Sequence, residues 1–208
     1  MKNIIFSIFT ACLLLSCSDS YELVNKYDDQ QRLSESFQID KKSGLMEGTY
    51  TKYFPNGKVE QLAEYKRNKL DGQRVLFYEN GDTLIIETYE NAEYQGVYKS
   101  FYADGVLESV GQYSEGAMNG QWKFYYDNKQ LKEEVGFVNN EEDGPFVEYH
   151  KNGKLKAKGT YKTTEENIDS SNREHGPLEM YDEEGELFKK MDCVLGVCRT
   201  TWSRDEES

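Results

Sequence analysis

Two cysteines near the C-terminus are placed to form a disulfide. Cys193 and Cys198 are separated by Val-Leu-Gly-Val. If Leu195-Gly196 forms a two-residue turn, the two cysteines lie directly opposite each other, and cysteines opposed in a non-hydrogen-bonded pair can bridge. A metal-binding pair is the alternative, but only His150 and His175 could add ligands, and neither is close in the sequence.

The N-terminal sequence predicts export and lipid attachment. Residues 1–16 open with Met-Lys-Asn and continue in an apolar run from Ile4 to Leu15. This run is shorter than the ~20 apolar residues of a membrane-spanning helix and is typical of a secretory signal. It ends in Leu-Leu-Ser-Cys, which resembles a bacterial lipobox, so we expect cleavage before Cys17 and acylation of this cysteine. An ordinary signal with a coincidental cysteine is the alternative. Cys12 would leave with the signal, and two cysteines would then remain for a disulfide in an oxidising compartment.

Motifs for catalysis are missing from the sequence. It contains no P-loop, no dinucleotide fingerprint, no GxSxG and no zinc-binding HExxH. The acidic doublets Glu133-Glu134, Glu141-Glu142 and Glu183-Glu184 lie in or near predicted turns and linkers, where we expect them to be solvated. The histidines have no nucleophile with motif support. The sequence therefore predicts a protein that is not an enzyme, with no cofactor and no bound metal.

The elements that must position these residues belong to a tandem repeat. One glycine recurs with 24 residues between successive copies, and a sixth copy follows after a spacing of 32. A fixed spacing of this kind indicates a repeat architecture. The opening glycines are Gly48, Gly72, Gly96, Gly120, Gly144 and Gly176.

Other residues keep their places within each unit, with positions counted from the opening glycine. Position 9 is glycine in every unit except one, and Asn or Asp precedes it in five units. Asn-Gly and Asp-Gly favour two-residue turns, which need positive φ at both central residues. Lys129 replaces the glycine in one unit and predicts a looser turn there. Position 5 is aromatic in all six units: Tyr53, Phe77, Phe101, Tyr125, Tyr149 and Tyr181.

The flanking residues predict strands. They are rich in Tyr, Phe, Val and Thr, which suit a pleated surface, and we interpret each unit as a strand, a tight turn, a returning strand and a polar linker. Aromatic residues fall on both faces, which favours a single sheet coiling on itself. Because one hairpin is marginal in water, the units must stack. The sequence predicts an all-β fold of tandem hairpins in an extended, twisted antiparallel sheet.

The unit pattern resembles a known family. The pattern G-x-[aromatic]-x-x-[YF]-[YF]-x-N-G-x-L, with a Tyr near the unit end, is similar to the variant MORN repeat of bacterial proteins. The resemblance covers residues 48–192, the expected repeat domain. It implies an extended antiparallel β array with no catalytic residues to carry over. Members of that group are often named as antitoxins of the YwqK type.

Two segments outside the regular pattern each admit two interpretations. Residues 17–47 form either a plain tether or a degenerate capping repeat that starts at Glu22, since terminal repeats are atypical. The fifth unit is lengthened by the segment 163–173, which is either a tolerated surface loop or a loop that contacts a partner. Residues 193–208 are expected to form a C-terminal hairpin, with Trp202 on a last strand, and a frayed acidic tail.

Charge and aromatic content limit the partners. Without Lys2, the mature chain has 24 basic and 38 acidic residues, a net charge of about −14. A nucleic-acid partner is excluded, because it needs clustered cations. The acidity serves either solubility or a cationic protein partner. Rings that stay exposed favour protein or glycan binding, and the candidate binding surface lies at position 6: Tyr78, Tyr102, Tyr126 and His150.

These observations predict a non-catalytic scaffold of the cell envelope. It would be lipid-anchored through Cys17, would face the periplasm or the cell surface, and would bind a protein. A more specific hypothesis is an immunity-like protein that masks a toxin. The alternative is a protein that binds peptidoglycan or another polysaccharide. The oligomeric state and the choice of inner or outer membrane stay open.

Overall fold

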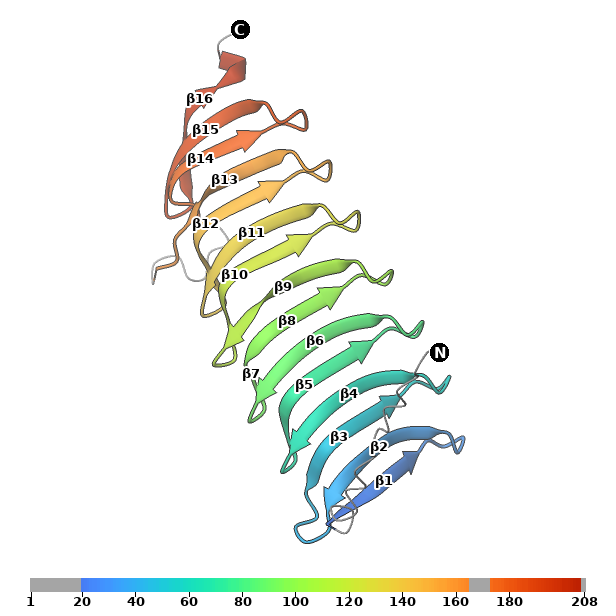
Figure 1. The fold of residues 1–208 in the computed structure, drawn as a ribbon. Helices are drawn as coiled ribbons and strands as arrows, with labels where there is room; N and C mark the ends of the chain where they lie inside the picture. Colours follow the sequence, from blue (N-terminus) through green and yellow to red (C-terminus); the bar gives the residue numbers. More distant parts are fainter. Residues whose placement is uncertain (1–19, 165–172, 207–208) are drawn as a thin grey trace, which may run out of the picture.

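The computed structural model describes residues 20–164 and 173–206. The predicted signal at 1–16, the lipidation site Cys17 and most of the lengthened segment 163–173 lie outside the described residues. The described chain forms one antiparallel sheet of sixteen strands that stays open, followed by a 3-10 helix at Arg204–Glu206. Figure 1 shows the hairpins stacked along one long axis, with β1 at one end and β16 at the other. The prediction of an all-β array of tandem hairpins is confirmed.

Strand order follows chain order along the sheet, and the short β7 pairs with β6. The strands are β1 (Tyr21–Tyr27), β2 (Leu33–Asp40), β3 (Met46–Tyr53), β4 (Val59–Lys66), β5 (Lys69–Phe77), β6 (Thr83–Glu90), β7 (Glu93–Tyr94), β8 (Gly96–Phe101), β9 (Leu107–Ser114), β10 (Ala117–Tyr125), β11 (Leu131–Val138), β12 (Glu141–Tyr149), β13 (Leu155–Tyr161), β14 (Gly176–Tyr181), β15 (Leu187–Val194) and β16 (Val197–Ser203).

An additional hairpin precedes the six regular units. In β1 and β2, Glu22 pairs with Ile39 and Tyr27 pairs with Leu33. This register repeats that of the first regular unit, where position 0 pairs with position 17 and position 5 with position 11. Of the two hypotheses for residues 17–47, the structure therefore shows a capping hairpin from residue 21 onward. The extra length of this unit lies in the loop 41–45.

The loops at position 9 have a different turn type from the one expected. Gly57 N donates to Phe54 O at 2.9 Å, and Phe54 N donates to Lys58 O at 2.8 Å. Within this loop only Gly57 has positive φ, at 83°, so the connection is a three-residue loop in which a left-handed residue follows a type I turn. The Asn56 side chain accepts a bond from Lys58 N at 2.9 Å, which supports this geometry. The place of the turn was predicted correctly and its two-residue form was wrong.

The prediction of a looser turn at Lys129 was also wrong. Lys129 N donates to Tyr126 O at 3.0 Å, as the glycines do in other units. Lys129 reaches this geometry with a φ of 70°, a left-handed conformation that is unfavourable for residues other than glycine. The neighbouring hairpins hold the loop in the common shape although its sequence does not favour it.

Two-residue turns connect the strands at the end opposite the position 9 loops, where polar linkers were expected. Arg67 and Asn68 have φ of 52° and 66°, and Asn139 and Asn140 have φ of 51° and 72°. The strands pair as far as these turns. Pairing gives the N–H and C=O groups of the linker residues hydrogen-bond partners within the antiparallel sheet. The turns of this kind are 67–68, 91–92, 115–116, 139–140 and 195–196.

The opening glycine of each unit lies at a bulge. Between the pairs Asn119↔Gln112 and Lys123↔Val110, four steps along β10 match two steps along β9. Gly120 lies within this stretch with a φ of 75°, which glycine adopts without steric cost. A bulge bends its strand, and repeated bulges at the same place make every hairpin bend in the same way, as Figure 1 shows.

The core lies on one face of the bent sheet, which we call the core face and which carries positions 2, 15 and 17. Trp122 is 2% exposed and lies between Val135 in its own unit, 0% exposed, and Gly111 in the preceding unit. A Cβ at Gly111 would come within 2.2 Å of the indole, so the large ring at position 2 requires a small residue beside it. Phe146 lies over Gly159, which is its pairing partner in the same unit.

We predict that Lys129→Gly raises the free energy of unfolding by about 0.5–1 kcal/mol, because the relief of left-handed strain exceeds the backbone entropy that glycine loses on folding. Denaturant unfolding of the two proteins measures the difference. The reverse change is Gly105→Lys. A Cβ at position 105 would meet no atom within 4 Å, so no steric clash is added, and the change should lower the stability by a similar amount. Equal stability of both variants and the wild type would contradict the strained turn.

Candidate functional site

The predicted binding residues at position 6 form a ladder between hairpins. The Tyr78 hydroxyl donates to Phe101 O at 2.8 Å, that of Tyr102 to Tyr125 O at 2.8 Å, and that of Tyr126 to Tyr149 O at 2.9 Å. His150 continues the ladder with Nε2 at 2.9 Å from Tyr181 O. All four side chains are half-buried. They link each unit to the next, and their polar atoms are engaged within the protein.

The loops carry a second ladder beside the first. Asn128 accepts a bond from Gln130 N through Oδ1 at 3.1 Å and donates through Nδ2 to Lys151 O in the next loop at 2.7 Å. Asn80 and Asn152 make the same pair of bonds. One asparagine side chain thus fixes its own turn and connects it to the following turn.

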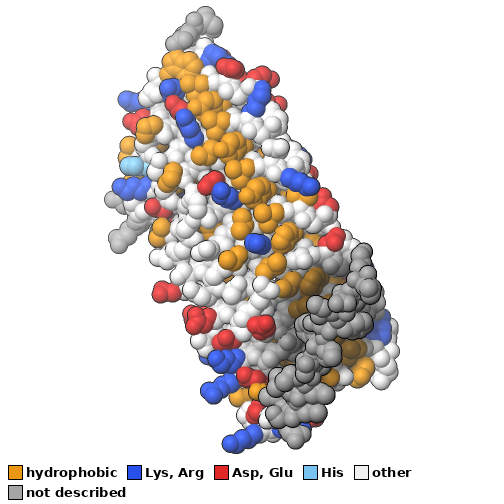
Figure 2. All heavy atoms as spheres, viewed as in Figure 1, with side chains coloured by type: hydrophobic (Ala, Val, Ile, Leu, Met, Phe, Trp, Pro, Cys, Tyr) orange, Lys and Arg blue, Asp and Glu red, His pale blue; other side chains and the backbone are white. Residues whose placement is uncertain are grey.

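The opposite face of the sheet, which we call the open face, carries a stripe of apolar side chains. Position 5 alternates with the core positions along the strand and therefore points to this face, and position 11 pairs with it. The rings of position 5 and the aliphatic residues of position 11 are half-buried. Figure 2 shows the stripe running along the molecule. We call it the ring stripe, and its central members are Phe77, Phe101, Leu107, Tyr125, Leu131, Tyr149 and Leu155.

Charged pairs line the ring stripe on the open face. Lys123 Nζ lies 3.4 Å from Glu134 Oε2, and Glu179 lies between Lys158 at 2.8 Å and Lys190 at 3.2 Å. Hydrogen bonds from Lys158, Tyr181 and Lys190 lower the pKa of Glu179 to about 2. The apolar stripe is thus bordered by ionised side chains of both signs.

Two of the three acidic doublets are in strands, so the expectation that they are solvated was wrong. Glu133 and Glu148 face each other across β11 and β12. Burial, together with the charge of Glu148, raises the pKa of Glu133, and burial raises that of Glu142. The strands extend further than predicted because the connection at 139–140 is a two-residue turn. The third doublet, 183–184, is exposed as expected.

One buried ion pair interrupts the core face. Arg74 Nε lies 2.6 Å from Glu87 Oε2, and Glu87 is 3% exposed. Tyr89 and Tyr94 donate their hydroxyls to the two oxygens of Glu87 at 3.2 and 3.0 Å. Burial lowers the pKa of Arg74, but the hydrogen bond and the charge of Glu87 outweigh it, and the pKa is raised above its usual value. Arg74 occupies position 2, where the other units carry a large apolar residue such as Tyr50 or Trp122, and its partner was not identified from the sequence. The signal was Glu87 at position 15, where other units carry Ala63 or Val135.

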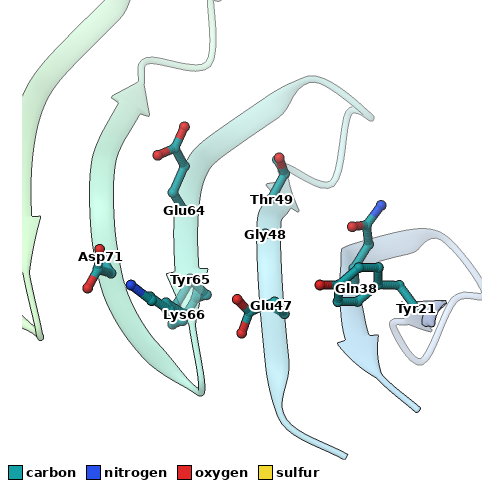
Figure 3. A pocket seen from close by; sticks show the side chains of 9 residues that line it. All are labelled: Tyr21, Gln38, Glu47, Gly48, Thr49, Glu64, Tyr65, Lys66 and Asp71. Carbon is teal, nitrogen blue, oxygen red and sulfur yellow. The ribbon is translucent and has the colours of Figure 1, made fainter. Parts of the chain in front are cut away.

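The first units contain an open, polar hollow of about 420 Å³ (Figure 3). Glu47 accepts a bond from Arg67 N at 3.0 Å, and the Glu64 carboxylate lies over the backbone of Gly72. Within residues 20–164 and 173–206, no group of three or more His, Cys, Asp and Glu side chains could hold a metal ion. The carboxylates around this hollow hold turns and cover a bulge.

The C-terminal hairpin contains the expected disulfide. Val194 pairs with Val197 and Cys193 with Cys198, and the two sulfur atoms are 2.06 Å apart. Cys193 is 1% exposed and packs with the last core residues. Trp202 lies on β16 as predicted. The expected frayed tail instead forms the 3-10 helix as far as residue 206, where Arg204 bonds Asp182 at 2.7 Å.

A helix able to cross a bilayer would need more length and hydrophobicity than any helix in the described part of the chain has.

This geometry defines a class of repeat protein, and comparison with known proteins identifies its family. The family model described as the MORN repeat variant matches residues 46–67, 70–91, 94–115, 118–139 and 142–163. The chain belongs to this family, whose repeats generally mediate binding to proteins or membranes. The hairpins at 21–40 and 176–194 lie outside the matched residues although they share the register of the matched units.

Comparison with curated proteins and with solved structures adds no evidence on function. A search of curated proteins gives no match. Two solved structures with similarity are a TcdB2–TccC3–Cdc42 crystal structure and a Tc holotoxin pore of Photorhabdus luminescens. Each has 10% sequence identity and a TM-score of 0.25, with 87% and 88% of this chain covered. The chain spans only 11% of the length of either protein.

We predict that Arg74→Tyr lowers the free energy of unfolding by about 3 kcal/mol or more, because it leaves the Glu87 carboxylate buried without its cation. The double variant Arg74→Tyr/Glu87→Ala reproduces the pair found at Tyr50 and Ala63 and should recover most of the loss. The midpoints of urea unfolding for the single and double variants measure both effects. A double variant no more stable than the single one would show that a Tyr–Ala pair cannot replace the ion pair at this place in the core.

We predict that Cys193→Ala/Cys198→Ala lowers stability by about 2 kcal/mol, the value that the entropy of closing so short a loop gives. Reductant should destabilise the wild type to a similar extent and leave the double variant unchanged. If reductant changes the stability of both proteins by the same amount, the disulfide does not contribute to the stability of the wild type.

Proposed function

We propose that this protein is a lipid-anchored, non-catalytic scaffold of the bacterial cell envelope that binds a protein partner along the ring stripe. The observation that carries the proposal is the stripe itself, a continuous apolar strip on an open sheet face with charged pairs along its border. Protein interfaces combine a ring-rich apolar centre with a polar rim. The lipobox-like sequence before Cys17 supports the anchor.

The composition of the ring stripe favours a protein over a glycan. Position 11 supplies Leu107, Leu131 and Leu155 beside the rings of position 5. Aliphatic side chains add apolar contact area for a protein surface but offer no face on which a sugar ring stacks or hydroxyl groups bond. Peptidoglycan or polysaccharide binding is therefore the second candidate, and it rests on the rings alone.

The chemistry of the partner follows from charge. The mature chain has a net charge of about −14, and complementary charge speeds association and selects partners. We infer a cationic protein, and a secreted toxin held in check by this chain is the more specific version. The antitoxin names used for similar proteins support that version by resemblance only.

Capture of envelope proteins on the purified mature chain tests the proposal. We expect a cationic protein to be recovered, and the variant Phe101→Ala/Tyr125→Ala/Tyr149→Ala to bind it at least tenfold more weakly, because rings at the centre of an interface each contribute more than about 1 kcal/mol. The matched control is Tyr78→Phe/Tyr102→Phe/Tyr126→Phe, which keeps the rings of the ladder and should bind normally. Circular dichroism checks that both variants are folded.

Three results would contradict the proposal. Unchanged binding by the alanine variant would exclude the ring stripe, and loss of binding by the phenylalanine variant would move the site to the ladder. Retention of the protein on peptidoglycan or polysaccharide, lost in the alanine variant, would favour the glycan candidate. The anchor has its own test, because Cys17→Ser should release the chain from the membrane fraction.

A further inference from the structure

The outer edge of β1 is a free strand edge at one end of the sheet. Within residues 20–164 and 173–206, β1 pairs with β2 alone, and Figure 1 shows no strand beyond it. Its large side chains are well exposed, with Tyr21 at 37%, Leu23 at 62% and Tyr27 at 57%. An edge strand offers unpaired N–H and C=O groups to another strand, and proline is one means of blocking it. The seven residues of β1 include no proline, so this edge can accept a strand.

Every second residue of β1 directs its backbone groups outward. Ser20 O accepts a bond from Lys41 N at 3.0 Å, and Lys26 O accepts one from the Ser34 hydroxyl at 3.1 Å. The residues with even numbers therefore bond towards β2. Because the two sides of an antiparallel strand alternate in this way, residues 21, 23, 25 and 27 present their N–H and C=O groups to the outside of the sheet.

The sequence of β1 is complementary to itself in the antiparallel direction. If two copies of β1 pair around Val24, Glu22 of each copy faces Lys26 of the other. In the same register, Tyr21 of each copy faces Tyr27 of the other. Opposite charges and aromatic rings that face each other across two strands stabilise a sheet. The strand thus carries the complementary charge and the matching rings for a second copy of itself.

The same register also satisfies the backbone. It sets odd-numbered residues opposite odd-numbered ones, so the outward N–H and C=O groups of the two copies meet, and all seven residues pair. A shift by one residue would set outward groups against inward ones. A shift by two would lose two of the seven pairs and would separate Glu22 from Lys26. In the matched register Lys26 lies between Glu35 of its own hairpin, at 3.0 Å, and Glu22 of the second copy.

The strand at the other end of the sheet, β16, does not have this property. Arg199 is the only charged residue of β16, so no symmetric pairing of β16 brings opposite charges together. Pairing of β16 with β1 of another copy would be heterologous, and a heterologous contact that does not close continues into chains of copies. Pairing of β1 with β1 closes after two copies and brings both pairs of charges together.

We propose that two copies of this protein pair through the outer edge of β1 and form a twofold dimer in which the two sheets become one. The axis passes beside Val24, and the core faces of both copies lie on the same side of the joined sheet. The dimer presents two ring stripes on its other side. The inference depends on neither the ring stripe nor the lipid anchor, because the contact is made by the backbone and side chains of β1.

Light scattering on the mature chain with Cys17→Ser, which cannot be acylated, tests the proposal. We expect the mass of a dimer that dissociates on dilution. Glu22→Lys or Lys26→Glu sets like charges against each other at both ends of the contact, and each should raise the dissociation constant of the dimer at least tenfold. The two variants mixed together should form a heterodimer, because the cationic edge of one then faces the anionic edge of the other.

Two further variants complete the test. Asn25→Pro removes an outward N–H without loss of a bond to β2 and should give a monomer that circular dichroism shows to be folded. The matched control for charge is Glu79→Lys, which changes an exposed loop residue away from β1 and should stay dimeric. A monomer at every concentration, a dimer that neither charge variant of β1 weakens, a mixture that forms no heterodimer, or chains of more than two copies would overturn the proposal.

Discussion

The structure depends on contact between neighbouring hairpins, because no hairpin here can bury its own rings. A two-stranded hairpin is marginal in water, and the ring at position 2 lies between position 15 of its own unit and position 15 of the preceding unit, so it is covered on both sides only when the units stack. Trp122 shows this clearly, since Gly111 of the unit before leaves the space that the indole fills. The tyrosine and asparagine ladders add hydrogen bonds between neighbouring units. Stability in such a protein is a sum of unit and interface contributions.

Much of this fold follows from the sequence because it is repeated. The glycine spacing, the aromatic alternation and the Asn-Gly pairs each predict the same hairpin, and the register of the last turn follows from Leu195-Gly196. The turn type could not be obtained in this way. Asn-Gly suits both a two-residue turn and a three-residue loop, and the choice depends on the loop stacked beside it, to which Asn80 donates.

The candidate surface was predicted less well than the fold. Adjacent aromatic residues such as Phe101 and Tyr102 indicate that each face receives one ring, but they do not indicate which ring is engaged. The difference lies in the hydroxyl of Tyr102, which reaches a carbonyl of the next hairpin 23 residues away. A bond of that kind depends on how hairpins stack, which a single unit does not encode. The ion pair of Arg74 and Glu87 lies within one hairpin, where position 2 pairs with position 15, so it could be identified only once the register of that hairpin was known.

The even spacing of the strands has a consequence for recognition. Each unit advances the ring stripe by two strands, about 10 Å, so equivalent side chains recur along the stripe at this interval. A partner with features at the same interval could bind in several positions, each shifted by one unit and nearly equal in energy. An irregular place on the same face, such as Thr83 where other units carry an aliphatic residue at position 11, removes this degeneracy. Imperfections in the repeat thus define a single alignment on a surface that is otherwise periodic.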